Sequence, residues 1–188
     1  MKKAILIIGG ARSGKSRFAQ ELGRKLGGAV LFVATAEAGD PEMCQRIEEH
    51  RKERPAAWHT LEVTCHVGNR IKQEIGEAQV VVVDCVTLLV SNIFSQYNDQ
   101  TLERIEESVL EEQVMAEISK LVECMRKIDA SFVIVSNEIG LGLVPTTRVG
   151  RLYRDLLGKA NQMLAQCADE VYLMVAGLPV KIKPLVEL

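Results

Sequence analysis

The stretch GGARSGKS at residues 9–16 decides how the rest of this sequence is interpreted. It matches the phosphate-loop pattern G-x-x-x-x-G-K-[ST], and it stands between a run of apolar residues and a helix-forming segment, the context that makes the pattern specific. The glycines of such a loop let backbone N–H groups turn inward around an anion, and the first turn of the helix adds its positive dipole end. The sequence therefore predicts a triphosphate-binding loop made of Gly9, Gly10, Ala11, Arg12, Ser13, Gly14, Lys15 and Ser16.

Two side chains of the loop and one aspartate elsewhere predict a magnesium site. Lys15 is expected to reach the β- and γ-phosphates of a nucleotide, and the hydroxyl of Ser16 is expected to bind Mg²⁺. The apolar run VVVVD ends in Asp84, where P-loop proteins carry a carboxylate that holds the metal or its water. These residues predict that a Mg²⁺–nucleotide binds, but they leave open what is done with its phosphates.

Apolar β-branched runs alternate with longer helical patterns along the chain. The predicted strands are residues 4–8, 30–34, 80–84, 131–136 and 170–176, with a weaker candidate at 58–63 and a final strand in GLPVKIK, whose Lys181 and Lys183 are expected to be solvated. The predicted helices cover 15–26, the segment from Asp40-Pro41 to before Pro55, 67–77, 101–127 and 147–168. Continuous apolar runs are typical of strands that are buried on both faces of a parallel sheet. We therefore expect a single α/β P-loop domain over residues 1–188, with a mainly parallel sheet that binds ligands at the carboxyl ends of its strands.

Composition and charge argue against several classes of protein. The formal net charge is −2 and no cluster of Lys and Arg stands out, so a nucleic-acid partner is not expected. The five cysteines are widely spaced and never form C-x-x-C, which favours reduced thiols over a disulfide framework or a zinc site. The apolar runs stay well short of the roughly 20 residues that span a bilayer. We expect a cytoplasmic protein with no membrane span.

One histidine lies in an unusual charge setting. Arg46, His50 and Arg54 are spaced four residues apart, so a helix places them on one face, and Arg51 and Lys52 follow the histidine directly. Neighbouring cations disfavour the protonated imidazole and attract phosphate, which suits a neutral histidine that attacks a phosphate ester. An ordinary solvated helix face that carries a surface histidine fits the same spacing.

Motifs along nearly the whole chain resemble one known family. GGARSGKS is followed in order by VATAE, RIEEHRKERPAAWHTLE, VDCVTLLVSN, SNEIGLGLVP and RLYRDLLGKANQMLAQCADEVYLMVAGLPVKIK. In this order the segments are similar to those of the bifunctional adenosylcobinamide kinase / adenosylcobinamide-phosphate guanylyltransferases of cobalamin biosynthesis. The patterns H-R-x-x-R-P-x-x-W and N-E-x-G-x-G-x-V-P are far more specific than the phosphate loop.

The resemblance implies two reactions on one corrinoid substrate. A nucleoside triphosphate, ATP or GTP, phosphorylates the aminopropanol hydroxyl of adenosylcobinamide. GMP is then transferred from GTP to the product through a guanylyl-histidine, here His50, which gives adenosylcobinamide-GDP and pyrophosphate. The resemblance also implies a sheet similar to that of RecA-type P-loop proteins and assembly as a homo-oligomer, in this family a trimer.

The nucleotide contacts that the resemblance implies fall on several segments. They are the loop Gly9–Ser16 with the catalytic Lys15, the strand end Ala34, Thr35 and Ala36, the residues Arg51, Lys52, Glu53 and Arg54 beside the catalytic His50, and finally Glu62 and Asp84. On spacing alone, Glu62 is an ordinary surface glutamate. Some members of the family carry Glu where this chain has Asp84, and the shorter side chain is compatible with metal binding through water.

Two other functions stay open on the residues alone. A small-molecule P-loop kinase would use the loop and Asp84 without any covalent intermediate. A RecA-type nucleotide-dependent binding module would use the helix predicted at 101–127 for a protein partner. The glycine-rich segment 138–148 is either a substrate-contacting loop or a simple connection. The preferred phosphoryl donor, the general base of the kinase step and the corrinoid-binding residues are not predicted.

Overall fold

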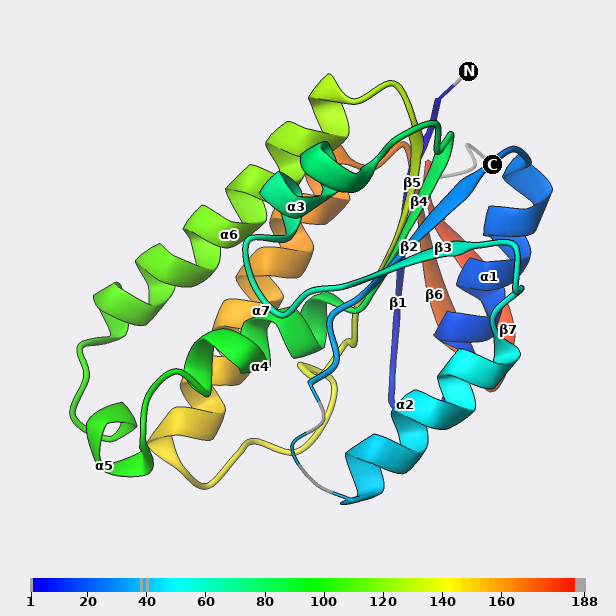
Figure 1. Ribbon diagram of the computed structural model, residues 1–188. Coiled ribbons are helices and arrows are strands. Elements are labelled where there is room, and N and C mark those ends of the chain that lie inside the picture. The colour runs from blue at the N-terminus through cyan, green and yellow to red at the C-terminus, as the bar shows by residue number, and fades with distance from the viewer. Residues whose placement is uncertain (1, 38, 40, 185–188) are drawn as a thin grey trace.

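A seven-stranded sheet forms the centre of the molecule (Figure 1). The computed structural model describes residues 2–37, 39 and 41–184, and the side chains of residues 41–43, 46, 50 and 53 also lie outside the description. Within these limits the strand order is β3-β2-β4-β5-β1-β6-β7. The strands are β1 Ala4–Gly9, β2 Val30–Ala34, β3 His59–Glu62, β4 Val80–Asp84, β5 Ser131–Val135, β6 Glu170–Val175 and β7 Leu178–Lys183.

The pairing of the strands confirms the predicted parallel sheet. Strands β3, β2, β4, β5, β1 and β6 pair in parallel, and the β6–β7 hairpin adds an antiparallel strand at one end of the described sheet. Strands β2 and β5 are buried along their whole length, as the unbroken apolar runs indicate. The weaker candidate at 58–63 is also a strand. Because β1 lies between β5 and β6, the phosphate loop leaves the middle of the sheet.

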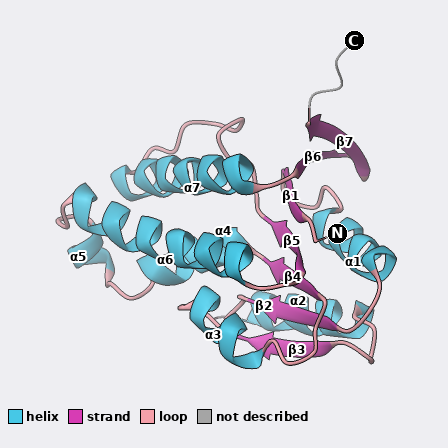
Figure 2. Cartoon of the chain, turned by 90° about the horizontal axis from the view of Figure 1, so that it is seen from above, coloured by secondary structure: helices cyan, strands magenta, loops and turns pink. Residues whose placement is uncertain are grey.

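Helices cover both faces of the sheet. Figure 2 shows α3, α4, α6 and α7 on one face and α1 on the other. Alternate residues of β1 pack against opposite helix layers. Leu6 packs with the first group of helices, whereas Ile5 and Ile7 pack with α1. The helices are α1 Lys15–Leu26, α2 Pro41–Glu53, α3 Val67–Glu74, α4 Val86–Phe94, α5 Asp99–Leu102, α6 Glu107–Lys127 and α7 Arg148–Cys167. Asp40, the predicted cap of α2, lies outside the described residues, and α2 ends before Pro55 as predicted.

Helix α4 was not predicted from the sequence. It begins directly after Cys85, and its sequence VTLLVSNIF is apolar on nearly all sides. Most of its residues are buried between the sheet and the outer helices. A helix that is buried all round carries no amphipathic period, so the usual signal is missing.

The prediction of a single helix at 101–127 was wrong in one respect, because the structure has two helices there, α5 and α6. The side chain of Asn98 caps α5 by accepting from the backbone N–H of Thr101 at 2.9 Å. Arg148 of α7 donates to the carbonyls of Leu102 at 3.2 Å and Ile105 at 2.9 Å. The guanidinium thus satisfies backbone oxygens that the break leaves without helical partners.

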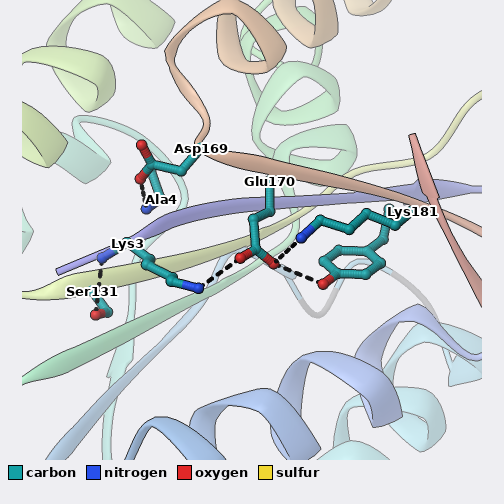
Figure 3. Close-up of polar contacts among 7 residues, drawn as sticks. Lys3, Ala4, Ser131, Asp169, Glu170 and Lys181 are labelled. Carbon is teal, nitrogen blue, oxygen red and sulfur yellow. Dashed lines mark hydrogen bonds and ion pairs between the residues drawn. The ribbon is translucent and has the colours of Figure 1, made fainter. Parts of the chain in front are cut away.

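Charged side chains tie the amino edge of the sheet together (Figure 3). Glu170 at the start of β6 accepts from Lys3 Nζ at 2.7 Å and from the hydroxyl of Tyr172 at 2.7 Å, and Lys181 Nζ lies 3.3 Å from it. Lys183 Nζ donates to the carbonyl of Ala165 at 2.8 Å. Lys181 is exposed, as predicted, and also pairs with Glu170, whereas the prediction of a solvated Lys183 was wrong because its side chain is half-buried against α7. In the part of the chain that the structure describes, no helix is long and apolar enough to cross a membrane.

We predict opposite effects for alanine at two helical glycines. A Cβ at Gly68 of α3 would lie 2.5 Å from the carbonyl oxygen of Lys120 on α6, so Gly68→Ala should lower the free energy of unfolding by about 1–3 kcal/mol. Gly158 of α7 has open space around its Cβ position, and Gly158→Ala should raise this free energy by roughly 0.5–1 kcal/mol. Urea unfolding of both variants measures the difference, and equal shifts would contradict the close approach of α3 and α6.

We also predict a pH-dependent role for Glu170. The hydrogen bond from Lys3, followed by that from Tyr172, lowers the pKa of Glu170 from 4.5 to about 2. A depressed pKa in the folded state means that the stabilisation is present above pH 4.5 and is lost as the pH falls towards 2. Glu170→Gln should therefore destabilise the protein at pH 7, and its difference from the wild type should shrink between pH 4.5 and 2. A difference that does not change with pH in urea unfolding would rule this out.

Candidate active site

The phosphate loop turns tightly between β1 and α1 because two of its glycines sit where no side chain fits. A Cβ at Gly9 would lie 2.6 Å from the backbone oxygen of Met174 on β6. Gly14 has a φ of +92°, in the left-handed region that favours glycine, and its Cβ would lie 3.3 Å from the Cα of Gly177. The N–H of Gly177 donates to the carbonyl of Ser13 at 3.1 Å. The β6–β7 hairpin therefore supports the loop from behind.

Lys15 is held out of water at the start of α1. Its side chain is buried, and Nζ donates to the carbonyl of Gly10 within the loop at 2.6 Å. Burial lowers the pKa of Lys15 from its ordinary value, and the nearby Cys85 and Asp84 act in the opposite direction. A partly desolvated ammonium beside an open nest of loop N–H groups favours an anion as its ligand.

Strand β4 brings Asp84 to the loop, and Thr35 fixes the backbone next to it. The hydroxyl of Thr35 donates to the carbonyl of Cys85 at 2.7 Å and accepts from the N–H of Cys85 at 2.8 Å. Thr35 is fully buried, whereas Ala34 and Ala36 on either side of it line the cavity. Burial and the neighbouring Asp84 raise the pKa of the Cys85 thiol to about 12, so it is neutral at physiological pH.

A cavity of about 480 Å³ opens above the loop at the carboxyl edge of the sheet. Its walls come from the loop, from residues at or near the ends of β2, β4 and β5, and from α2 with the residue that follows it. The lining residues are Ala11, Arg12, Ser13, Gly14, Lys15, Ser16, Arg17, Phe32, Ala34, Ala36, Ile47, Glu49, Arg54, Asp84, Cys85, Leu88, Val135 and Asn137. Many of the residues that the sequence predicts for the site therefore line one cavity, and Gly9, Gly10 and Thr35 lie outside its lining.

Arg54, just after α2, supplies a second cation to the cavity. Its guanidinium carbon lies 4.3 Å from the ring centre of Phe32, and that ring in turn stacks on Trp58 at 6.2 Å. Burial lowers the pKa of Arg54 from its ordinary value, whereas Asp84 raises it. Its Nε is buried without a hydrogen-bond partner among the described residues. A buried donor without a partner, on a partly desolvated cation that lines the cavity, fits a bound oxyanion.

Glu62 and Arg51 form an ion pair beside a second, adjoining pocket. Arg51 Nε donates to Glu62 Oε1 at 3.0 Å. This pocket also measures about 480 Å³, and Ala36 belongs to the walls of both hollows. Its lining residues are Ala36, Glu37, Glu62, Val63, Thr64, Cys65, His66 and Arg70. The sequence-predicted Glu62 is thus not in the phosphate cavity but in the pocket next to it.

The remaining predicted residues lie on α2. Lys52 is exposed to solvent. The backbones of His50 and Glu53 belong to α2, but their side chains lie outside the described part of the structure. The structure therefore brings the loop, Asp84 and Arg54 together and says nothing of where the imidazole points.

The oxygen donors of the cavity fit a magnesium ion held jointly with a nucleotide. Asp84 offers a carboxylate and Ser16 a hydroxyl, and both line the cavity. Over the described residues, no group of three or more His, Cys, Asp or Glu side chains is placed to hold a metal. Mg²⁺ in nucleotide sites typically takes one or two protein oxygens and completes its shell with phosphate and water.

Sequence reasoning missed several residues of the cavity wall. Phe32 lies within a buried strand, where an aromatic residue is expected to be core, and only the tertiary fold reveals that Arg54 stacks on it. Asn137 follows β5, and in the sequence analysis it is only the first residue of the family pattern N-E-x-G-x-G-x-V-P. The signal that was available for Asn137 is its position one residue beyond a buried strand run, at the edge where ligands bind.

The fold and the site define a P-loop nucleotide-binding transferase. A model of the family "Cobinamide kinase / cobinamide phosphate guanyltransferase" matches residues 5–182 of the chain. The chain therefore belongs to this family, and the predicted transferase of cobalamin biosynthesis is confirmed.

Named relatives support the same family over nearly full length. "Bifunctional adenosylcobalamin biosynthesis protein CobU" of Escherichia coli (strain K12) is 42% identical over 95% of this chain and 99% of its own. The protein of the same name from Salmonella typhimurium is 40% identical with the same coverage. "Bifunctional adenosylcobalamin biosynthesis protein CobP" of Pseudomonas aeruginosa is 40% identical over 95% of this chain and 96% of its own.

The fold is also similar to a solved structure from another family. The "Crystal structure of the RadB recombinase" superposes with a TM-score of 0.50 at 17% identity, over 91% of this chain and 73% of that one. At this identity the likeness concerns the fold alone, and it confirms the predicted RecA-type architecture.

We predict that Arg54→Ala weakens nucleotide binding by about 10–100-fold, because a hydrogen bond to a charged group contributes roughly 1.5–3 kcal/mol. Calorimetric titration with a non-hydrolysable triphosphate measures the loss. Arg126→Ala is the matched control, because Arg126 is an exposed arginine at the opposite, amino edge of the sheet. An Arg54→Ala variant that binds the nucleotide as tightly as the control would show that the guanidinium is not a phosphate ligand.

Proposed function

We propose that a single triphosphate cavity in this chain serves both reactions of the family. In the first reaction, the γ-phosphate of ATP or GTP passes to the aminopropanol hydroxyl of adenosylcobinamide. In the second, GTP supplies GMP to the phosphorylated product. The observation that carries the proposal is that Arg54, next to α2, and Lys15, from the phosphate loop, are two partly desolvated cations on one cavity. A triphosphate would add negative charge to that of Asp84, which already acts on both cations.

His50 is the proposed nucleophile of the second reaction. Ile47 of α2 lines the cavity, and position 50 is three residues from it, so helical spacing assigns this position to the same side of α2. A ring nitrogen forms a bond to the α-phosphorus of GTP, the bond from that phosphorus to the α–β bridging oxygen breaks, and pyrophosphate leaves. The phosphate of adenosylcobinamide phosphate then displaces the histidine, which gives adenosylcobinamide-GDP.

The phosphate loop, Lys15 and Arg54 are suited to this chemistry because negative charge grows on the departing pyrophosphate. Donors that already face that position stabilise the charge without reorganising. When bound, Mg²⁺ would neutralise phosphate charge, and Ser16 and Asp84 would hold it. The other predicted nucleotide contacts, Ala34, Thr35, Ala36, Lys52 and Glu53, belong to the same proposal.

The pocket beside the phosphate cavity is the proposed site of the guanine base. A guanine edge presents N–H donors that suit a carboxylate, and an acceptor oxygen that suits a guanidinium. Glu62 and Arg70 line this pocket and offer both groups. Ala36 lies on both walls, so a nucleotide with its phosphates on the loop can extend into it.

We also propose that the chain works as a cytoplasmic homo-oligomer, with the trimer as the expected form. Strand β7 ends the described sheet, and it presents an edge to solvent together with exposed apolar side chains, Leu178, Val180 and Ile182. An exposed apolar edge strand is a surface that favours association. All five cysteines are free, which suits a reducing compartment.

The covalent step is tested with GTP labelled at the α-phosphate. After denaturation, the wild type should retain one label that is lost in acid and stable in base, as expected for a phosphoramidate on histidine. His50→Ala should lose this label and GMP transfer, while ATP-dependent phosphorylation of adenosylcobinamide stays within about threefold of the wild type. His59→Ala, an exposed histidine on β3, is the matched control and should keep the label.

Two outcomes would contradict the proposal. An unlabelled wild type that still binds GTP would remove the guanylyl-histidine and favour a P-loop kinase without a covalent intermediate. A label that persists in His50→Ala would assign the nucleophile to another residue.

A further inference from the structure

The sheet order brings the end of β5 to the centre of the phosphate site. Strand β5 lies between β4, which carries Asp84, and β1, which leads into the phosphate loop. Both neighbours are in register with Val135, because Asp84 and Ile7 each pair with it. The residues just beyond Val135 therefore stand between the proposed metal ligand and the phosphate loop.

The backbone of this segment is held firmly. The N–H of Asn137 donates to the hydroxyl of Thr87 at 2.7 Å, and its carbonyl accepts from the side chain of Asn161 at 3.0 Å. The N–H of Glu138 donates to the carbonyl of Gly9, the first glycine of the loop, at 3.0 Å. The side-chain amide of Asn137 lines the cavity, and it makes no hydrogen bond with any described residue. Asn137 is therefore a polar residue of the cavity wall whose backbone is fixed.

The loop that continues from Asn137 exposes an apolar tip. Leu141, Leu143 and Val144 are 83%, 96% and 65% exposed, which is far more than a surface connection requires. The tip nevertheless has a defined turn, because the N–H of Gly142 donates to the carbonyl of Ile139 at 3.2 Å and Ile139 packs on the core. In Figure 1 this loop (yellow) runs along the same edge of the sheet as the phosphate loop and α2.

The far end of the loop is tied to α7. Arg151 donates to the carbonyls of Pro145 and Thr146 at 3.1 and 2.8 Å, and Thr147 caps the helix by accepting from Gly150 at 3.1 Å. Hydrogen bonds at the backbone of Asn137 and from Arg151 thus hold the two ends of the loop, and the apolar tip begins four residues after Asn137, which lines the cavity. Such an arrangement suits a ligand with one small reactive group and a large apolar face.

A corrinoid has this form. Its hydroxyl sits on a short aminopropanol arm, and its macrocycle is a broad apolar surface with an amide fringe. We propose, on the basis of the two-reaction function above, that residues 137–144 form the corrinoid acceptor site. The amide of Asn137 binds the reacting hydroxyl or the phosphoryl group that it receives, and Leu141, Leu143 and Val144 bind the face of the macrocycle.

The assignment makes separate predictions for the two parts of the site. Leu141→Ser/Leu143→Ser should raise the KM for adenosylcobinamide at least tenfold, because it removes apolar contact area, while kcat and the Kd for nucleotide change less than twofold. Asn137→Ala should lower kcat of the kinase step at least tenfold. Neither change should reduce covalent labelling of the protein by GTP, which involves no acceptor.

The experiment combines steady-state kinetics of the kinase reaction with equilibrium dialysis in the presence of the triphosphate analogue. The dialysis measures the binding of adenosylcobinamide directly from its visible absorbance. Val109→Ser is the matched control, because Val109 is an exposed aliphatic residue on α6, and it should leave KM and binding unchanged. An unchanged corrinoid affinity in the double serine variant would overturn the assignment, and so would an equal loss of GTP labelling in Asn137→Ala. A wild type that binds adenosylcobinamide but forms no phosphorylated product would instead contradict the proposed function.

Discussion

Two partly desolvated cations determine which ligands this site favours. Lys15 is buried against its own loop, and Arg54 rests on the face of Phe32 with a donor nitrogen that has no partner among the described residues. Keeping charge in such places costs free energy unless an anion completes the site. The glycines allow the tight turn that places Lys15 against its own loop, and the stack of Phe32 on Trp58 supports the guanidinium of Arg54. A triphosphate is the anion that the proposed function assigns to both cations.

The order of the strands determines which residues would surround the triphosphate in the proposed function. Strand β1 supplies the loop, β4 supplies Asp84, and β5 lies between them with Asn137 at its end. Helix α2 closes the other side, with Ile47 and Glu49 on the cavity wall. In the proposed function the γ-phosphate is attacked from the β5 side and the α-phosphate from the α2 side, so one nucleotide site is enough. The topology is compatible with two reactions in a chain of 188 residues.

Much of this arrangement could be predicted from the sequence because its signals are local. The loop, the apolar strand runs and Asp84 are read from short patterns, and all of them lie where the patterns predict. Helix α4 was missed because it is buried on all sides, and the break before α6 was missed because the guanidinium that stabilises it comes from α7. The contact of Arg54 with Phe32 joins residues from different elements, so no pattern reveals it. The corrinoid substrate and the role of the histidine were predicted from the family motifs. The spacing of charges on α2 alone did not predict them.

The central claim is that one cavity serves both reactions, and the most direct measurement is competition between two nucleotides. The analogue α,β-methylene-GTP blocks attack on the α-phosphate, and β,γ-imido-ATP blocks transfer of the γ-phosphate. In calorimetric titrations the account predicts one molecule of either analogue per chain, full competition between them, and loss of both on Lys15→Ala. Simultaneous binding of the two analogues, or a Lys15→Ala variant that loses one and keeps the other, would contradict it.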